Sequence, residues 1–103
     1  MIYVFDIDGT ICTIVENAQY EKAKPYQKRI DIVNKLYKDG NVIKMFTARG
    51  STTKIDWTAL TKKQLSDWGL NYHELIMNSK PEGDIFIDDK AINSDSFFST
   101  RND

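Results

Sequence analysis

The chain has 103 residues, of which 41% are hydrophobic and 12% aromatic, and its formal net charge at pH 7 is -1. This length predicts a single domain, 1–103, with enough apolar side chains to form its own core. The near-neutral charge provides no basic surface for nucleic acid or anionic lipid, so we expect neither as a partner.

The cysteine content and the apolar runs indicate the compartment. Cys12 is the single cysteine, which excludes an internal disulfide framework and is typical of a reducing compartment. The first residues lack the basic and apolar regions of a signal peptide, and no apolar run approaches the ~20 residues of a membrane span. We therefore expect a cytoplasmic protein without a membrane segment.

The first predicted element is a strand at 2–6, IYVFD, whose nearly continuous apolar run is typical of a strand buried on both faces. Residues 12–25 are mixed and polar, and we expect a loop or flap without firm structure. From Tyr26 to Asp39 apolar side chains recur at helical spacing, which predicts a helix closed by a C-terminal cap at Gly40.

The second half of the chain continues the alternation of strands and helices. Its predicted elements are a strand, a helix and two further strands, at 41–46, 54–68, 75–77 and 85–87. Phe97 and Phe98, in the polar tail, are expected to pack back on the sheet. This order predicts an α/β fold with a parallel sheet that helices cover on both faces.

Polar, reactive side chains follow each predicted strand. They are, in chain order, Asp6 and Asp8, then Thr47, then Lys80, and finally Asp88 and Asp89. Because parallel strands end at one edge of a sheet, where α/β proteins bind their ligands, we expect these side chains to meet at one site. Burying carboxylates is costly unless a cation meets them, so a purely structural role explains them poorly.

The four aspartates predict a metal and a phosphate. Their mutual repulsion would be relieved by a hard dication, and oxygen ligands suit Mg²⁺, which would in turn attract a phosphate group. Lys80 and the Thr47 hydroxyl could hold that phosphate. Backbone N–H groups of Ala48 and of the turn at Gly9 could also bind its oxygens.

Two of the aspartates suit a covalent mechanism. Asp6 ends its strand and is rigidly placed, which favours a nucleophile that forms an aspartyl-phosphate. Asp8 could protonate the leaving oxygen and later deprotonate the hydrolytic water. Arg49 could bind a second anionic group of the substrate, although a surface ion pair explains it equally well. We assign no role to His73 and a packing role to Cys12.

Bacterial receiver domains also combine clustered aspartates with a threonine and a lysine. In those domains the phosphoacceptor follows the third strand, whereas Asn78 and Ser79 follow the third predicted strand here. The order of the motifs therefore argues against a receiver.

Four segments resemble, in order and along nearly the whole chain, the motifs of the haloacid dehalogenase (HAD) superfamily of phosphohydrolases. They are D-x-D-G-T at 6–10, the strand ending in Thr47, Lys80-Pro81 and Asp88-Asp89. MFTARG and FIDDKAIN further resemble small HAD phosphatases encoded with bacterial capsular and surface polysaccharide genes. The resemblance implies a Rossmann-like three-layer sandwich, with the first strand between the second and the fourth.

The resemblance also implies roles for the site residues. Asp6 is then the nucleophile and Asp8 the acid/base, while Thr47 and Lys80 bind phosphate. Mg²⁺ is held by Asp6, by the Asp8 carbonyl and by the aspartates of the fourth motif, Asp88 and Asp89.

We therefore expect a Mg²⁺-dependent phosphatase acting on a small phosphate monoester, a sugar phosphate of capsular or surface polysaccharide biosynthesis. The segments between the motifs are too short for the cap domain with which family members exclude water. We expect a dimer or tetramer whose partner subunit covers the site near Arg49 and the 11–25 flap. Two alternatives stay open: a phosphatase of a polynucleotide end or phosphoprotein, and a non-catalytic HAD-like binding module.

Overall fold

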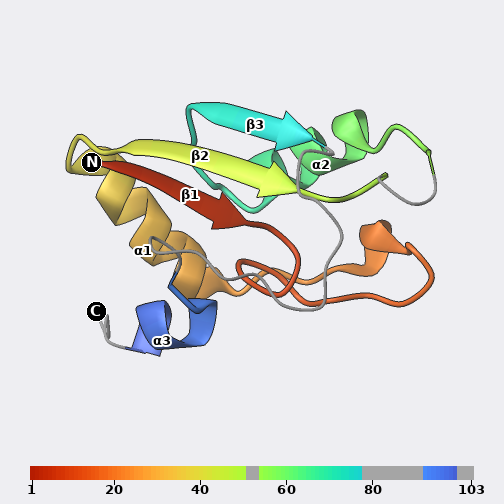
Figure 1. The fold of residues 1–103 in the computed structure, drawn as a ribbon, viewed down its shortest axis with the longest axis horizontal. Coiled ribbons are helices and arrows are strands. Elements are labelled where there is room, and N and C mark those ends of the chain that lie inside the picture. The colour runs from red at the N-terminus through yellow and green to blue at the C-terminus, as the bar shows by residue number, and fades with distance from the viewer. Residues whose placement is uncertain (51–53, 78–91, 100–103) are drawn as a thin grey trace.

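The computed structural model describes residues 1–50, 54–77 and 92–99 of the chain (Figure 1). Strands and helices alternate: β1 (Ile2–Asp6), α1 (Gln27–Lys38), β2 (Val42–Thr47), α2 (Thr58–Asp67), β3 (Glu74–Met77) and α3 (Ser94–Ser99), with a 3-10 helix, η1 (Tyr20–Lys22), ahead of α1. The predicted strands at 2–6, 41–46 and 75–77 and the helix at 26–39 are confirmed. The strand predicted at 85–87 lies outside the described residues.

The helix predicted at 54–68 is confirmed with a later start. Asp56 accepts a hydrogen bond from the Thr58 N–H at 2.9 Å, just where α2 begins. A carboxylate is stabilised by the N–H groups at the start of a helix, and this contact with Thr58 lowers the pKa of Asp56. None of the helices in the described residues is long and apolar enough to cross a membrane.

The strands form a parallel sheet in the order β1-β2-β3. In Figure 1 the three arrows run in the same direction. The register places Phe5 beside Met45 and Asp6 beside Phe46, so the ends of β1 and β2 meet at one edge of the sheet. This is the edge at which the sequence predicts a site.

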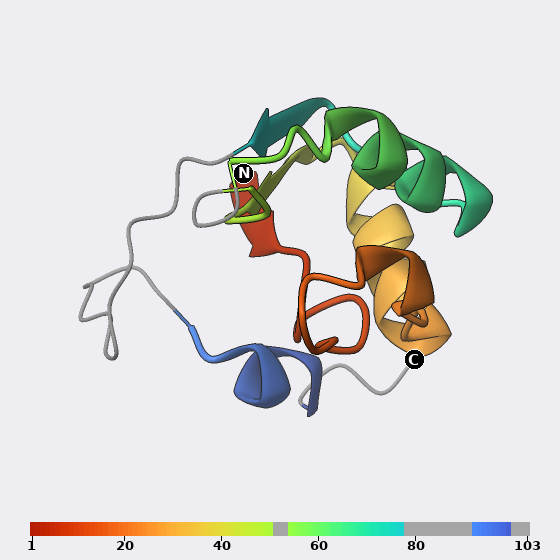
Figure 2. The ribbon, with the colours of Figure 1, turned by 90° about the vertical axis from the view of Figure 1, so that its right-hand side faces the viewer.

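One face of the sheet carries the core. Its buried apolar side chains come from the sheet, α1, α2 and α3: Phe5, Ile43, Met45, Ile30, Val33, Leu65 and Phe98. Figure 2 shows α1 and α2 on the same side of the strands. On the other face of β1, Ile2 and Val4 are 64% and 54% exposed. The described residues thus supply two layers, and the third layer of the expected sandwich stays a prediction.

The C-terminal aromatic residues pack on β1, as expected. Phe98 is buried, and the Phe97 ring lies 6.2 Å from the Tyr3 ring and 5.6 Å from the Phe5 ring. Edge-to-face contacts at these distances stabilise aromatic clusters beyond the area they bury. α3 is therefore held against the sheet by its two phenylalanines.

The segment at 12–25 forms the expected loop, without an α-helix or a named strand, and it contains one short 3-10 helix. Its two ends are joined by hydrogen bonds: the Thr13 N–H donates to the Lys24 carbonyl at 2.9 Å, and the Lys24 N–H donates to the Thr13 Oγ1 at 3.0 Å. Between them the chain forms the single turn η1. Backbone bonds and side-chain bonds together close this segment, which we call the flap.

Candidate active site

The loop after β1 is a tight turn built on the backbone. The N–H groups of Thr10 and Ile11 both donate to the Ile7 carbonyl, at 3.1 and 3.0 Å. Gly9 has a φ of +82°, a conformation that side chains other than glycine rarely adopt. The Ile7 side chain is fully buried under this turn and fixes its position. Asp6 and Asp8 therefore stand on a rigid loop at the edge of the sheet.

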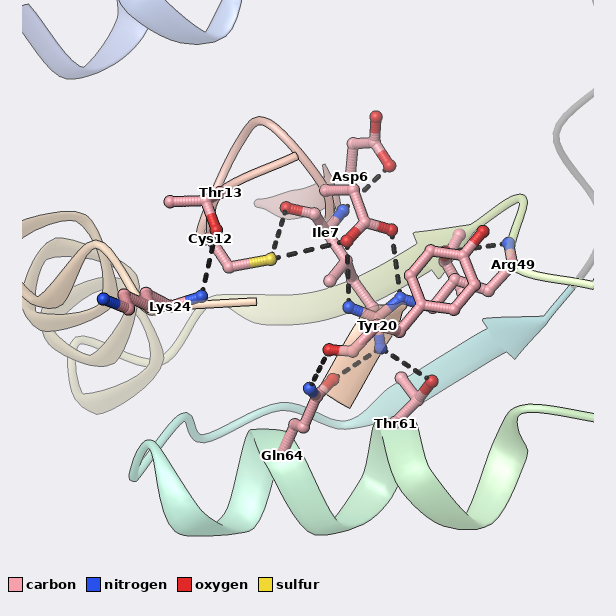
Figure 3. A network of polar contacts seen from close by, with 11 residues as sticks. Asp6, Ile7, Cys12, Thr13, Tyr20, Lys24, Arg49, Thr61 and Gln64 are labelled. Atoms are coloured by element: carbon pink, nitrogen blue, oxygen red, sulfur yellow. Dashed lines mark hydrogen bonds and ion pairs between the residues drawn. The ribbon is translucent and has the colours of Figure 1, made fainter. Parts of the chain in front are cut away.

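Asp6 is the last residue of β1 and is partly buried. Its Oδ1 accepts a hydrogen bond from the Ile7 N–H at 2.8 Å (Figure 3). A backbone donor to a carboxylate makes a strong, oriented bond. The Asp6 side chain is thus positioned by its own turn, as expected for a residue at the end of a strand.

Asp8 forms a two-bond ion pair with Arg49. The Arg49 Nε donates to Oδ2 at 3.0 Å and Nη2 donates to Oδ1 at 2.9 Å. The Arg49 side chain is 1% exposed and that of Asp8 22% exposed. The two planar groups match in this geometry, so both carboxylate oxygens of Asp8 are engaged by one guanidinium.

The rest of the Arg49 guanidinium is also occupied. Its Nη1 donates to the Thr61 Oγ1 at 3.1 Å and to the Gln64 Oε1 at 2.6 Å. The Tyr20 ring covers it, with the guanidinium carbon 4.6 Å from the ring centre. Figure 3 shows these groups converging on Arg49 from α2 and from the flap. Of the two interpretations of Arg49, substrate binding or a surface ion pair, the structure shows an ion pair. The Arg49 side chain is buried in it and does not lie on the surface.

Sequence reasoning missed the three residues that hold Arg49: Tyr20, Thr61 and Gln64. A signal for two of them was present, because helical spacing puts Thr61 and Gln64 on the same face of α2 as the buried Leu65. A polar side chain on the inward face of a helix needs a buried partner. Tyr20 carried no comparable signal, since it lies in an irregular polar segment.

Gln64 also connects α2 to the flap. Its Nε2 donates to the Tyr20 carbonyl, while the Tyr20 ring meets the Trp57 ring edge-on at 5.0 Å. Burial raises the pKa of the Tyr20 hydroxyl, and the negative charge of Asp8 adds to that effect. The flap is consequently fixed over Arg49 by contacts with α2.

Thr47 and Ala48 lie at the same edge of the sheet. Thr47 ends β2, is 1% exposed, and accepts a hydrogen bond from the Arg49 N–H at 3.1 Å through its Oγ1. That bond uses an oxygen lone pair and leaves the hydroxyl proton as a donor. Ala48 is exposed. The Gly9 N–H, which the sequence predicts as a phosphate donor, here donates to the Cys12 carbonyl at 2.9 Å, within its own loop.

Cys12 packs beneath the site. Its side chain is fully buried, and its Sγ lies 3.5 Å from the Asp8 Oδ1 and 3.7 Å from the Ile7 carbonyl oxygen. Burial, together with the nearby negative charge of Asp8, raises the pKa of the Cys12 thiol to about 12. A thiol with so high a pKa is a poor nucleophile, so the predicted packing role is confirmed.

The structure describes only some of the proposed metal ligands and phosphate-binding residues. Lys80, Asp88 and Asp89 lie outside the described residues. Within 1–50, 54–77 and 92–99, no three His, Cys, Asp or Glu side chains are grouped to hold a metal ion. The Asp6 carboxylate is a hard oxygen donor that suits Mg²⁺. The Asp8 side chain fits less well because Arg49 binds both its oxygens, which leaves its carbonyl as the ligand.

The comparisons with known proteins bear on the fold. No protein-family model and no curated protein matches this chain. The fold is similar to that in the crystal structure of an MCSG target from Vibrio cholerae, with a TM-score of 0.84 and 22% identity, over 95% of this chain and 87% of that one. Such a similarity shows a shared fold alone. The chain is therefore a small α/β protein with a parallel sheet, a layout compatible with a Rossmann-like core.

Proposed function

We propose that this protein is a Mg²⁺-dependent phosphatase of the HAD type that hydrolyses a small phosphate monoester through an aspartyl-phosphate on Asp6. The observation that supports this most directly is the placement of Asp6 and Thr47. They end two neighbouring parallel strands, so a carboxylate and a hydroxyl meet at one edge of the sheet. This edge is the usual ligand site of an open α/β sheet.

The proposed reaction uses these side chains in two steps. An Asp6 oxygen attacks phosphorus, the bond from phosphorus to the leaving oxygen breaks, and Asp8 gives that oxygen a proton. Water then attacks phosphorus and Asp8 takes a proton from it, while the bond from phosphorus to the Asp6 oxygen breaks, which releases inorganic phosphate and restores the Asp6 carboxylate. Thr47 donates its hydroxyl hydrogen bond to a phosphate oxygen. Mg²⁺ bound at Asp6 and the Asp8 carbonyl would neutralise charge on the phosphoryl oxygens.

The substrate class rests on the resemblance of MFTARG and FIDDKAIN to phosphatases of surface polysaccharide synthesis. We propose a sugar phosphate of that biosynthesis, in the cytoplasm. The segments between the motifs are short for a cap, and for that reason we propose a dimer or tetramer whose partner subunit shields the site. A nucleic acid partner finds no support in a formal net charge of -1.

A second candidate is a non-catalytic binding module. The observation that favours it is the engagement of both Asp8 oxygens by Arg49. In such a module the pair would hold the loop after β1 against β2 and α2, with no proton transfer at Asp8. Activity measurements separate the two candidates.

The deciding experiment measures phosphate release from a panel of sugar phosphates, with a 5′-phosphorylated oligonucleotide and a phosphopeptide beside them. We expect Mg²⁺-dependent turnover of a sugar phosphate that EDTA abolishes. Asp6→Asn should lose it, while the matched variant Asp67→Asn, an exposed carboxylate paired with Lys63, should retain it. Turnover of the oligonucleotide or peptide alone would favour a macromolecular substrate. No phosphate release from any of the substrates would favour the binding module.

A second measurement tests the covalent step. Acid quenching during turnover of a labelled substrate should trap phosphate on the wild-type protein as an acyl phosphate that hydroxylamine releases. Asp6→Asn should trap none. Turnover without a trappable label, and with Asp6→Asn still active, would contradict the aspartyl-phosphate route.

A further inference from the structure

We propose that Arg49 is a positioning residue that orients Asp8, and that it does not bind the substrate. The inference rests on the proposed phosphatase activity for its kinetic consequences, while the contact itself can be tested without turnover. It replaces the expectation that Arg49 receives a second anionic group of the substrate.

The two hydrogen bonds of the Arg49–Asp8 pair hold the Asp8 carboxylate in one orientation. Two parallel N–H to oxygen bonds, at 3.0 and 2.9 Å, fix the rotation of the Asp8 carboxylate as well as its distance. With 22% of the Asp8 side chain exposed, only the outward lone pairs of its oxygens can reach a ligand. Arg49 thus decides which lone pairs face the site.

The N–H donors of the Arg49 guanidinium are nearly all occupied within the protein. Four of its five N–H donors are engaged, by Asp8, Thr61 and Gln64, and the Tyr20 ring covers the guanidinium. To reach a substrate, Arg49 would have to leave these partners. The buried Thr61 and Gln64 side-chain oxygens on α2 would then lose their hydrogen-bond donor. A binding arginine would need exposure, whereas this side chain is 1% exposed.

Arg49 also connects Asp8 to Thr47. The backbone N–H of Arg49 donates to the Thr47 Oγ1 at 3.1 Å, and the Arg49 side chain holds Asp8. One residue therefore aligns the hydroxyl at the end of β2 with the acid that follows β1. Side chains fixed in this way by buried neighbours keep a site in its productive geometry.

The flap takes part in this arrangement. Gln64 accepts from Arg49 through Oε1 and donates to the Tyr20 carbonyl through Nε2. A change at Gln64 therefore loosens Arg49 without touching Asp8. This gives a second variant for cases in which a change at Arg49 prevents folding.

The kinetic test compares Arg49→Lys with wild type on two substrates, one with a single phosphate and one with an additional anionic group. Because a lysine keeps the charge but lacks the planar fork, we expect kcat to fall about 100-fold, the scale of general acid–base catalysis, with KM nearly unchanged on both. A rise in KM confined to the substrate with the additional anion would overturn the proposal and restore a binding role.

The leaving group provides a readout that loss of stability would not change. A poor leaving group needs the proton from Asp8 and a good one does not, so Arg49→Lys and Gln64→Leu should both slow the poor one more. In the Asp8→Asn background, Arg49→Lys should add little further loss to the rate of enzyme phosphorylation. An equal, additive loss in both backgrounds would show that Arg49 does not act through Asp8.

The contact itself is tested by ¹⁵N NMR of the arginine side chains in the protein without substrate. We expect an Arg49 Nε–H signal that exchanges slowly with water, shifts strongly in Asp8→Asn and stays in place in Asp6→Asn. A fast-exchanging signal, or one indifferent to Asp8→Asn, would overturn the proposal even if the phosphatase assay succeeds. A protected, Asp8-dependent signal with no activity would uphold the contact and reject the phosphatase.

Discussion

His73 and Ile43 hold each other by two hydrogen bonds at the start of the β2–β3 pairing. The Ile43 N–H donates to the His73 Nδ1 at 3.0 Å, and the Ile43 carbonyl accepts the His73 N–H at 2.8 Å. The imidazole takes the place of a strand carbonyl and stacks on the Tyr37 ring at 4.6 Å. A side chain with no evident role in the sequence thus extends the sheet.

Replacing His73 should separate these two contacts. His73→Phe keeps a ring against Tyr37 but leaves the buried Ile43 N–H without an acceptor, which should cost about 1–3 kcal/mol. His73→Asn offers an oxygen near the Nδ1 position and should cost about 1 kcal/mol for the lost ring contact. Urea unfolding of both variants checks this order. A greater cost for asparagine would show that stacking, and not the hydrogen bond, matters at this position.

Breaking the buried pair at Arg49 should be strongly destabilising. Arg49→Met leaves Asp8, Thr61 and Gln64 without their donor, and removing one partner of a buried ion pair costs about 3–5 kcal/mol. The control is Lys63→Met, which breaks the exposed pair with Asp67 and should cost about 0.5 kcal/mol or less. Denaturant midpoints measure both, and equal costs would contradict the buried pair.

Cys12 should make the protein less stable in alkali. The folded thiol has a pKa of about 12 against an ordinary value of 9.0, so above pH 9 the unfolded chain releases a proton that the folded chain keeps. The unfolding free energy should then fall by up to about 1.4 kcal/mol per pH unit between pH 9 and about 12. Below pH 9 this contribution is constant.

The measurement for Cys12 is a set of unfolding curves between pH 7 and 11 for wild type and Cys12→Ala. The alanine variant should start lower, because it loses packing, and then show a shallower decline. Iodoacetamide should modify the wild-type thiol only after unfolding. Rapid alkylation of the folded protein at pH 8.5 would contradict the burial of Cys12.

Gly9→Ala should destabilise the turn for two reasons. The φ of +82° is strained for alanine, and an added Cβ would lie 3.0 Å from the Ile14 Cδ1. Gly69→Ala is the matched control, with a φ of +73° and nothing within 4 Å of its Cβ. Both should lose about 1 kcal/mol to backbone strain, and Gly9→Ala should lose only slightly more, because the exposed Ile14 side chain can move away from the added Cβ. Thermal unfolding checks this, and adding Ile14→Ala should recover the difference.

The strands and helices in the described residues follow from local patterns. The apolar run at 2–6 and the helical spacing at 26–39 predict β1 and α1. The side chains that a strand or a helix buries recur along the sequence in a pattern typical of that element. The same reasoning places Asp6 and Thr47 at strand ends. Parallel pairing then puts both at one edge of the sheet, as observed.

The sequence did not determine what Arg49 contacts. Its partners come from a loop 41 residues earlier and from α2, 12 and 15 residues later, and no local pattern specifies such distant pairs. Burial made the difference, because a guanidinium without water must satisfy its N–H groups on side chains that the fold brings close. The local sequence pattern thus determined the strands and helices and the position of the carboxylates at the end of β1. Tertiary packing decided that Arg49 holds Asp8.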